Sequence, residues 1–501
     1  MMPLSSWPHL GRHAGAAGAG ALLTLAFAPF NLWPLAVLCP ALVMALWQGV
    51  PPRVAAWSGF WFGAGTFMAG TWWLYISLHT IGQAPVWIAV PLMLALVAVM
   101  ACFYGLLGWL TARWLPTQGA LRWLLGLPGA WLLIEWWRGW FLSGFPWLSL
   151  GYSQSDTWLA AWAPVLGVYG ISALLLLMSG ALLTLWRGRG RSRALAVAVL
   201  ALPWLVASGL QRVDWTRVSG PAVTVAIVQG AVPQDLKWIE RNLEPTRALY
   251  RRLNDQALGA KLVLWPESAV PELANDMVDY LIDIHGRSVQ AGSEVVMGVM
   301  RRADNGGNYF NSMMVLSSPL AFYDKRHLVP FGEYFPVPDT VRSWMRLMSL
   351  PYSDFTAGAG RQPALRAGGL NLAPTICYED SYGSAQLSVL READVLANVT
   401  NDAWFGHSPA RYQHFQIGRM RALEAQRYLL RAANDGVSAI VGPRGEVLQR
   451  AAEYRPGVLR GTVEPRTGLT PYARIGNWPA VLLALAAALF AAFAAARHRR
   501  T

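Results

Sequence analysis

The chain contains apolar stretches that are each long enough to cross a lipid bilayer, and these constrain its fold more than any other feature. About 20 apolar residues in a helix span the hydrocarbon core. Only 14% of the 501 residues are charged, whereas roughly a quarter are charged in soluble domains. We therefore expect an α-helical transmembrane bundle of about eight spans. The expected spans are residues 14–28, 32–49, 55–77, 86–111, 121–137, 164–186, 194–210 and 478–496.

The positions of the basic residues predict how these spans are oriented. Lys and Arg in short loops mark the cytoplasmic side of a membrane. Arg12, Arg53 and the Arg cluster at 187–193 lie in loops of one parity, whereas the loop at 77–85 carries no Lys or Arg. Both termini are thus expected in the cytoplasm. The net charge of +13 gives no reason to expect a nucleic-acid partner, because the basic residues are dispersed along the inner face of the membrane.

Residues 212–476 differ in character from the apolar runs on either side. They hold all the Lys residues and most of the acidic ones, and short apolar runs alternate with helical patterns. We expect an α/β extracytoplasmic domain here, between a transmembrane bundle at 1–211 and a final helix with a cytoplasmic tail at 477–501. The longest helix is expected at 411–433. The expected strands are 223–228, 262–264, 295–299, 313–316, 372–376, 395–399 and 439–441.

Cys377 is the cysteine most suited to chemistry, because it stands where an apolar strand gives way to polar residues. Cys39 and Cys102 fall inside expected spans and are read as packing residues. A thiol attacks as thiolate and needs a base, and its tetrahedral intermediate needs a cation or N–H donors. Glu267 and Lys325 each follow an apolar run. Spacing alone does not bring these segments together, and a lone Cys is more often structural.

Several longer strings resemble a known enzyme family. The motifs WPES (265–268), YDKRHLVPFGEY (323–334) and CYED (377–380) occur in the order of the Glu-Lys-Cys triad of the carbon-nitrogen hydrolase, or nitrilase, superfamily. The strings HLVPFGEY, ICYED, NVTNDAWFG and GFPWLSLGYSQ, with spans on both sides, are similar to those of the apolipoprotein N-acyltransferase family. The resemblance covers nearly the whole chain.

The resemblance implies a fold, an activity and a location. The fold would be an αββα nitrilase-like sandwich on the periplasmic side of a bacterial inner membrane. The activity would be a ping-pong acyltransfer in lipoprotein maturation, without a cofactor or metal, by a protein expected to be a monomer. A phospholipid, typically phosphatidylethanolamine, would acylate the Cys, and the thioester would then acylate the N-terminal amine of a diacylglyceryl-cysteine apolipoprotein.

The resemblance also implies the roles of individual residues. Cys377 would be the nucleophile, Glu267 the general base and acid, and Lys325 the oxyanion stabiliser together with the backbone N–H of Tyr378. Glu333 would orient Lys325 or assist proton transfer. Tyr378 and Glu379 would shape the acyl and amine sites, and Trp238 would lie near the cleft. Asn308 and residues 401–405 would hold the loops of the site.

Two membrane features complete the sequence reading. The long connection at 336–360 carries Trp344, Met345 and Leu347 beside Arg residues. It is expected to be an interfacial lid that contacts the lipid substrate. Glu135 and Arg138, three residues apart on the fifth expected span, are either a functional intramembrane pair or a structural one.

Two other functions compete with acyl transfer. A membrane-tethered amidase of the same superfamily would resolve the acyl-enzyme with water. Such an enzyme needs only one span, whereas eight spans favour a substrate drawn from the bilayer. A transporter or sensor would bind a ligand without chemistry. It would place ionisable residues deep in several spans, and the expected spans carry almost none.

Overall fold

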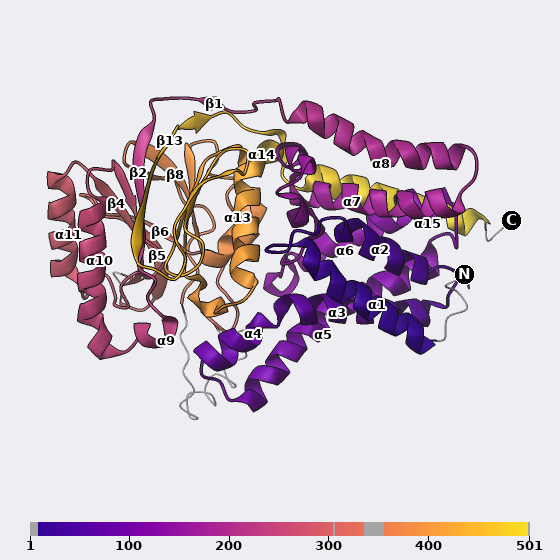
Figure 1. The fold of residues 1–501 in the computed structure, drawn as a ribbon, viewed down its shortest axis with the longest axis horizontal. Coiled ribbons are helices and arrows are strands. Elements are labelled where there is room, and N and C mark those ends of the chain that lie inside the picture. Colours follow the sequence, from indigo (N-terminus) through magenta and orange to yellow (C-terminus); the bar gives the residue numbers. More distant parts are fainter. Residues whose placement is uncertain (1–8, 304–305, 335–354, 499–501) are drawn as a thin grey trace. The chain divides into compact units, whose positions relative to one another are not determined.

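The structure, a computed structural model, describes residues 9–303, 306–334 and 355–498 (Figure 1). It divides into two compact units. Unit 1 comprises Met1–Asp214, Phe405–Gln416 and Thr470–Thr501, and unit 2 comprises Trp215–Trp404 and Ile417–Leu469. Unit 1 therefore includes two segments, 405–416 and 470–476, that the expected boundaries assign to the α/β domain.

Unit 1 is helical, and a helix lies in each of the eight ranges where a span is expected. Four helices in the described part of the chain are long and apolar enough to cross a membrane: Val86–Trp114, Trp158–Arg187, Arg191–Leu210 and Trp478–Arg497. A 12-residue helix such as Leu35–Leu46 is only about 18 Å long, less than the hydrocarbon core. The number of spans stays a prediction. The helices are α1 (His9–Leu23), α2 (Leu35–Leu46), α3 (Pro52–Thr71), α4 (Trp73–Tyr75), α5 (Val86–Trp114), α6 (Leu127–Arg138), α7 (Ala163–Arg187), α8 (Arg191–Leu210), α14 (Pro471–Ile475) and α15 (Trp478–His498).

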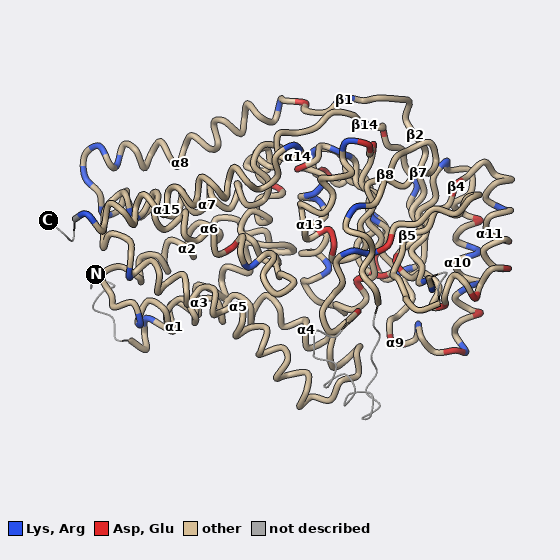
Figure 2. The backbone as a smooth tube through the Cα atoms, turned by 180° about the vertical axis from the view of Figure 1, so that it is seen from behind, with Lys and Arg blue, Asp and Glu red and all other residues tan. Residues whose placement is uncertain are grey.

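Buried arginines close helix ends in unit 1. The Arg122 guanidinium donates to the carbonyl oxygens of Thr111 and Pro116, at 3.2 and 2.8 Å, and to that of Trp47 at 3.3 Å. Arg12 donates to the carbonyl of Leu46. These bonds tie the end of α2 and the segment after α5 together, where carbonyls at and beyond a helix end need partners from outside the helix. Figure 2 shows basic positions of unit 1 gathered at the end that holds α1, the α7–α8 turn and the end of α15.

Glu135 and Arg138 of α6 fix the loop that follows this helix. Glu135 accepts a hydrogen bond from the Ser172 hydroxyl at 2.5 Å and one from the Leu150 N–H at 3.4 Å. Arg138 donates to the carbonyl of Trp147 at 2.8 Å and to the Ser149 hydroxyl at 3.3 Å. Both side chains therefore bind the loop, which favours the structural reading of this pair.

Unit 2 contains two six-stranded sheets, and each has parallel strands at its centre. Strands β2, β3 and β4 are parallel in one sheet, and β8, β9 and β10 in the other. Because these strands are parallel, their carboxyl ends lie at the same edge of each sheet. The strand order of the first sheet is β13 (Gly457–Val463), β2 (Val223–Gln229), β3 (Leu262–Leu264), β4 (Glu294–Arg302), β5 (Tyr309–Val315) and β6 (Ala321–Asp324). The strand order of the second sheet is β12 (Val447–Arg450), β11 (Ala439–Val441), β10 (Leu429–Ala433), β9 (Val395–Thr400), β8 (Leu370–Ile376) and β7 (Leu365–Ala367). A separate pair is formed by β1 (Arg217–Val218) and β14 (Arg466–Thr467).

The two sheets pack face to face, with helices outside them. Ile227 and Leu264 of the first sheet share one core with Leu372 and Leu430 of the second. Helices α10 (Leu243–Ala257) and α11 (Val278–Gln290) lie side by side on the other face of the first sheet (Figure 1) and form a second core with it. On the second sheet, Gly418 of α13 (Ala410–Ala425) lies against β10. This is the expected αββα layering.

The expected helix at 411–433 is wrong in its second half. Helix α13 ends at Ala425, and Gln426 takes a φ of 45°. Residues Leu429–Ala433 form β10, which is buried along its whole length between β9 and β11. The helical spacing of apolar residues continues into this segment, but pairing on both sides overrides it. All seven expected strands are present, and the missed ones are β1, β6, β7, β10, β12, β13 and β14.

Candidate active site

The proposed catalytic residues follow strand ends in unit 2. Glu267 follows β3, Lys325 follows β6 and Cys377 follows β8. Cys377 and Ser268, which is next to Glu267, have φ angles of 52° and 44°, a region that costs a non-glycine residue about 1 kcal/mol or more. A side chain on Gly298 would come within 2.5 Å of the Glu267 Cα atom. The backbone is therefore held in an unusual path around these residues.

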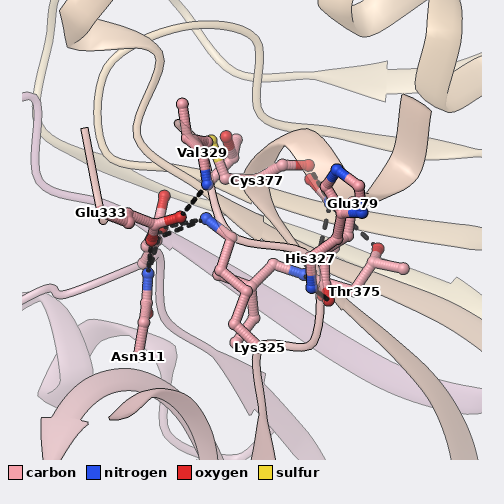
Figure 3. Close-up of polar contacts among 12 residues, drawn as sticks. Asn311, Lys325, His327, Val329, Glu333, Thr375, Cys377 and Glu379 are labelled. Carbon is pink, nitrogen blue, oxygen red and sulfur yellow. Dashed lines mark hydrogen bonds and ion pairs between the residues drawn. The ribbon is translucent and has the colours of Figure 1, made fainter. Parts of the chain in front are cut away.

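Lys325 joins the two carboxylates of the site, and Figure 3 shows its side chain directed at Glu333. Its Nζ atom lies 2.9 Å from Glu333 Oε1 and 3.5 Å from Glu267 Oε1. The Asn311 amide donates to the same two oxygens, at 2.8 Å and 2.7 Å. Glu333 also accepts from the Val329 N–H at 2.9 Å. The structure thus brings Glu267 and Lys325 together, with Glu333 in the position expected of a residue that orients Lys325.

The surroundings of Cys377 favour the protonated form of its sulfur. Burial raises the pKa of the Cys377 thiol, and the nearby Glu267 carboxylate raises it further, while Lys325 opposes this rise. Burial alone would lower the pKa of Lys325, but Glu333, Glu267 and Cys377 outweigh burial and raise it. Lys325 therefore stays cationic. A thiol in this environment needs a base to remove its proton before it can attack.

Glu379 holds the turn that carries Cys377. Its carboxylate accepts from the backbone N–H groups of Ile376, Arg326 and His327, at 2.9, 2.7 and 3.1 Å. The Tyr323 hydroxyl donates to it at 3.0 Å. This side chain is 1% exposed. These bonds join two loops, and the expectation that Glu379 shapes the acyl and amine sites stays a prediction.

A buried ion network underlies the same turn. Arg431 donates to Asp380 and to Asn398 Oδ1, both at 2.8 Å, and to Asp402 at 3.1 Å. Asn398 in turn donates to the Cys377 carbonyl at 3.4 Å and to Thr375 Oγ1 at 3.0 Å. The position of Cys377 is therefore linked to central strands of the second sheet.

The other expected site residues lie in different settings. Tyr378 is half-buried in an aromatic cluster, with its ring centroid 6.3 Å from His327 and 5.4 Å from Tyr382. Trp238, at the end of α9 (Gln234–Lys237), is 53% exposed. Trp344, Met345 and Leu347 lie outside the described residues.

Two residues with contacts in this site were missed by the sequence reading. Asn311 is buried in β5, and an Asn in an apolar strand is unusual enough to have been a signal. The expected loop-holding residue, Asn308, is instead exposed in the β4–β5 turn. Lys237 is buried close enough to Glu267 to interact with its charge, and nothing in the local sequence indicated this. In the described parts of the chain, no three His, Cys, Asp or Glu residues are grouped to hold a metal.

Comparisons with known proteins match both parts of the chain. The family model of the apolipoprotein N-acyltransferase N-terminal domain matches residues 19–181, and that of carbon-nitrogen hydrolase matches residues 224–472. A crystal structure of a CN-hydrolase superfamily protein from Xanthomonas campestris has 19% identity and a TM-score of 0.36, covering 49% of this chain and 91% of its own. The two family models define the class: the chain combines an apolipoprotein N-acyltransferase N-terminal domain with a carbon-nitrogen hydrolase domain.

Curated relatives define the family. An apolipoprotein N-acyltransferase from Chromobacterium violaceum is 42% identical over 470 residues, covering 93% of this chain and 90% of the relative. One from Pseudomonas putida is 42% identical, covering 93% and 94%. The chain belongs to the apolipoprotein N-acyltransferase family and is an acyltransferase, which confirms the resemblance seen in its motifs.

Proposed function

We propose that this protein moves a fatty acyl chain from a phospholipid, typically phosphatidylethanolamine, through a thioester on Cys377 to the N-terminal amine of a diacylglyceryl-cysteine apolipoprotein. The name of its relatives supports the apolipoprotein as acceptor. The observation that carries the proposal is the buried Lys325 ammonium, within 3.5 Å of both Glu267 and Glu333 and close enough to interact with the Cys377 thiol.

In the first half-reaction, Glu267 takes the proton of the Cys377 thiol and the sulfur attacks the ester carbonyl of the phospholipid. A C–S bond forms, and the negative charge on the carbonyl oxygen is stabilised by Lys325. The tetrahedral intermediate then breaks its C–O bond to the glycerol. Glu267 returns its proton to that oxygen, so the products are a lysophospholipid and an acyl-thioester.

In the second half-reaction, the acceptor amine attacks the thioester carbonyl while Glu267 takes one amine proton. A C–N bond forms and the C–S bond breaks, so the sulfur leaves and recovers its proton from Glu267. No further reagent is needed. A thioester suits this step because it reacts with an amine more readily than the original ester does.

Glu333 has a different task from Glu267, although both bind Lys325. It lies 0.6 Å closer to the Lys325 amine (2.9 against 3.5 Å) and is also held by the Val329 N–H. Glu333 therefore positions the cation, and Glu267 is the carboxylate available for proton transfer.

We further propose that the protein lies in a bacterial inner membrane, with unit 2 on the periplasmic side and both termini in the cytoplasm. The four long apolar helices and the basic end of unit 1 support this (Figure 2). Protease added to intact spheroplasts is expected to cleave within unit 2 and to leave tags at both termini intact. Cleavage of the tags instead would reverse the orientation.

Mass spectrometry of the purified protein incubated with phosphatidylethanolamine tests the chemistry. We expect an added acyl mass on the Cys377 peptide, which hydroxylamine removes and a diacylated lipopeptide amine accepts. Cys377→Ser is expected to show no such mass. Lys325→Ala should fold but react on the order of a hundredfold more slowly, since loss of one oxyanion stabiliser costs about 3 kcal/mol.

The same experiment separates the competing functions. Acyl transfer to the lipopeptide by Cys377→Ser at the wild-type rate would overturn the mechanism. Release of the acyl chain to water at one rate, with or without the lipopeptide, would identify an amidase.

A further inference from the structure

Strand β6, which ends just before Lys325, lies at the edge of the first sheet. In the described structure, β5 pairs with it on one side and no strand pairs with it on the other. An edge strand has backbone N–H and C=O groups that need partners from elsewhere. On the β5 side, the Lys325 N–H donates to the Asn311 carbonyl at 2.8 Å. The partners on the open side therefore decide how firmly the end of this strand is held.

Two residues of the segment 358–362 bind this open side. The Gln362 side-chain amide accepts from the Asp324 N–H at 2.8 Å and donates to the Asp324 carbonyl at 2.7 Å. The Gly358 N–H donates to the Lys325 carbonyl at 2.8 Å. The segment has no helix or strand and is largely exposed. Its three bonds thus take the place of the neighbouring strand that β6 lacks.

The segment approaches β6 so closely that position 358 requires a glycine. A Cβ atom on Gly358 would overlap the Asp324 carbonyl oxygen and come within 2.7 Å of the Asp324 Cβ atom. At Gly360, two residues later, an added Cβ atom would meet nothing within 4 Å. A side chain is therefore excluded at position 358 and tolerated at position 360.

The side chain of Asp324 is held independently of this segment. Arg301 donates to its two carboxylate oxygens, at 3.0 and 2.6 Å, and the Ser312 hydroxyl donates to one of them at 2.6 Å. Together with the Gln362 amide, these bonds give every polar group of Asp324 a protein partner. Because Lys325 is the next residue, a shift of the Asp324 backbone would also move Lys325.

The Lys325 amine acts in a site with little tolerance for displacement. It is 1% exposed and lies 2.9 Å from Glu333 Oε1 and 3.5 Å from Glu267 Oε1. A donor stabilises an oxyanion from a distance of about 2.7–3.1 Å. A misplacement of about 1 Å can cost about a hundredfold in rate. The position of the Lys325 backbone is therefore expected to affect catalysis.

We propose that Gly358 and Gln362 are positioning residues, which hold the backbone of Asp324 and Lys325 so that the Lys325 ammonium reaches the oxyanion of the acyl-transfer reaction. The proposal rests on the proposed function, in which Lys325 is the oxyanion stabiliser. Gly358 and Gln362 take no part in the bond changes. Their replacement should slow the chemical step and leave lipid binding unchanged.

The rate of Cys377 acylation by phosphatidylethanolamine, followed by mass spectrometry at several lipid concentrations, tests this inference. Gly358→Ala is expected to lower the maximal rate about tenfold, because the added methyl group pushes the segment away from Asp324. The lipid concentration at half-maximal rate should stay the same, since the oxyanion charge develops only in the transition state. The matched control Gly360→Ala should react at the wild-type rate, and an equal loss in this control would contradict the inference.

Gln362→Met is an independent variant that keeps the inference testable if Gly358→Ala does not fold. It keeps the length of the side chain but has no N–H group for the Asp324 carbonyl. We expect the maximal rate to fall about fivefold. Its control is Gln290→Met, at the exposed end of α11. A wild-type maximal rate for Gly358→Ala or Gln362→Met would overturn the inference, as would a change in the half-maximal lipid concentration alone.

A double-mutant cycle with Lys325→Ala distinguishes positioning from a general structural effect. In a protein that lacks the Lys325 ammonium, Gly358→Ala and Gln362→Met are each expected to cause no further slowing. If either substitution slows Lys325→Ala by its full factor, it acts on something other than Lys325, and the inference is refuted.

The Lys325→Ala variant also separates failure of this inference from failure of the proposed function. If Lys325→Ala is acylated at the wild-type rate, Lys325 is not the oxyanion stabiliser, and the proposed function fails. If Lys325→Ala is slow while Gly358→Ala and Gln362→Met react normally, only the positioning role is refuted.

Discussion

Each unit of the molecule buries a glutamate close to a basic residue, and the two glutamates differ in what binds them. Glu135 of unit 1 accepts from a hydroxyl and a backbone N–H, while Arg138 binds atoms of the neighbouring loop. Glu267 of unit 2 lies among charged groups, with Lys325 at 3.5 Å and Lys237 nearby. The two residues are 1% and 8% exposed.

The comparison shows that burial alone does not distinguish a reactive carboxylate from a structural one. Neutral donors such as those around Glu135 fix a loop and have no proton to exchange near neutral pH. Around Glu267 the neighbours include titratable cations and a thiol, which can exchange a proton with the carboxylate. The following predictions test this contrast, from the largest expected effect to the smallest.

Substitution of the two glutamates should affect activity very differently. Glu267→Gln is expected to reduce the rate of acyl-enzyme formation on the order of a thousandfold, because general base catalysis contributes about 10²–10⁴. Glu135→Gln should leave that rate within about threefold, since a Gln oxygen still accepts a hydrogen bond. The measurement is single-turnover acylation followed by mass spectrometry. Similar losses of acylation rate in both variants would show that the two glutamates do not differ in this way.

Glu379→Ala tests a carboxylate with a structural task in unit 2. It would leave one buried and two partly buried backbone N–H groups without an acceptor, and we expect a loss of about 3 kcal/mol of unfolding free energy. Denaturant unfolding of the protein in detergent provides the measurement. The control, Glu240→Ala, removes an exposed carboxylate and should leave stability unchanged. A stable Glu379→Ala protein would refute the proposed anchoring role.

Asn311→Ala removes the amide that Glu267 and Glu333 share. The expected result is acylation slowed about tenfold, because the two carboxylates lose their common donor and move relative to Lys325. Asn308→Ala is the matched control, since Asn308 is exposed a few residues earlier. A tenfold loss in the control as well would show that the turn, and not the amide, sets the rate.

Lys237→Met should stabilise the fold slightly. Burial lowers the pKa of Lys237 from 10.5 to about 8, so between these values the folded wild type binds fewer protons than the unfolded chain, and its stability rises with pH. The advantage of the variant, about 1–2 kcal/mol, is thus full below pH 8 and disappears towards pH 10.5. Thermal unfolding midpoints across this range measure it, and a constant difference would contradict the explanation.

The sequence predicted the elements whose burial leaves a local pattern. All seven expected strands are apolar runs, and two of them, β3 and β8, end just before Glu267 and Cys377, whereas β6, which precedes Lys325, was missed. Strand β10 was missed because Leu429–Ala433 is compatible with continuation of the preceding helix. Strands β12 and β13 were missed because they contain exposed polar residues at the edges of their sheets.

The missed site residues depend on contacts between distant parts of the chain. Asn311 reaches Glu267 across 44 positions of sequence, and the helix that carries Lys237 is bound by Asn401 through Gln234, 167 positions away. Neither contact can be predicted from the local spacing of residues. The anchoring bonds of Glu379 could not be predicted for the same reason, since a carboxylate next to a nucleophile gives no indication of which backbone groups it binds.

The left-handed backbone of Cys377 has a practical consequence for the choice of an inactive variant. Serine and alanine at this position inherit the cost of a positive φ, about 1 kcal/mol or more, whereas glycine does not. Cys377→Gly is therefore the preferable unreactive protein for capturing a donor lipid or an acceptor peptide. The difference in thermal unfolding midpoint between the Cys377→Gly and Cys377→Ala variants would measure how much stability the positive φ at this position costs the fold.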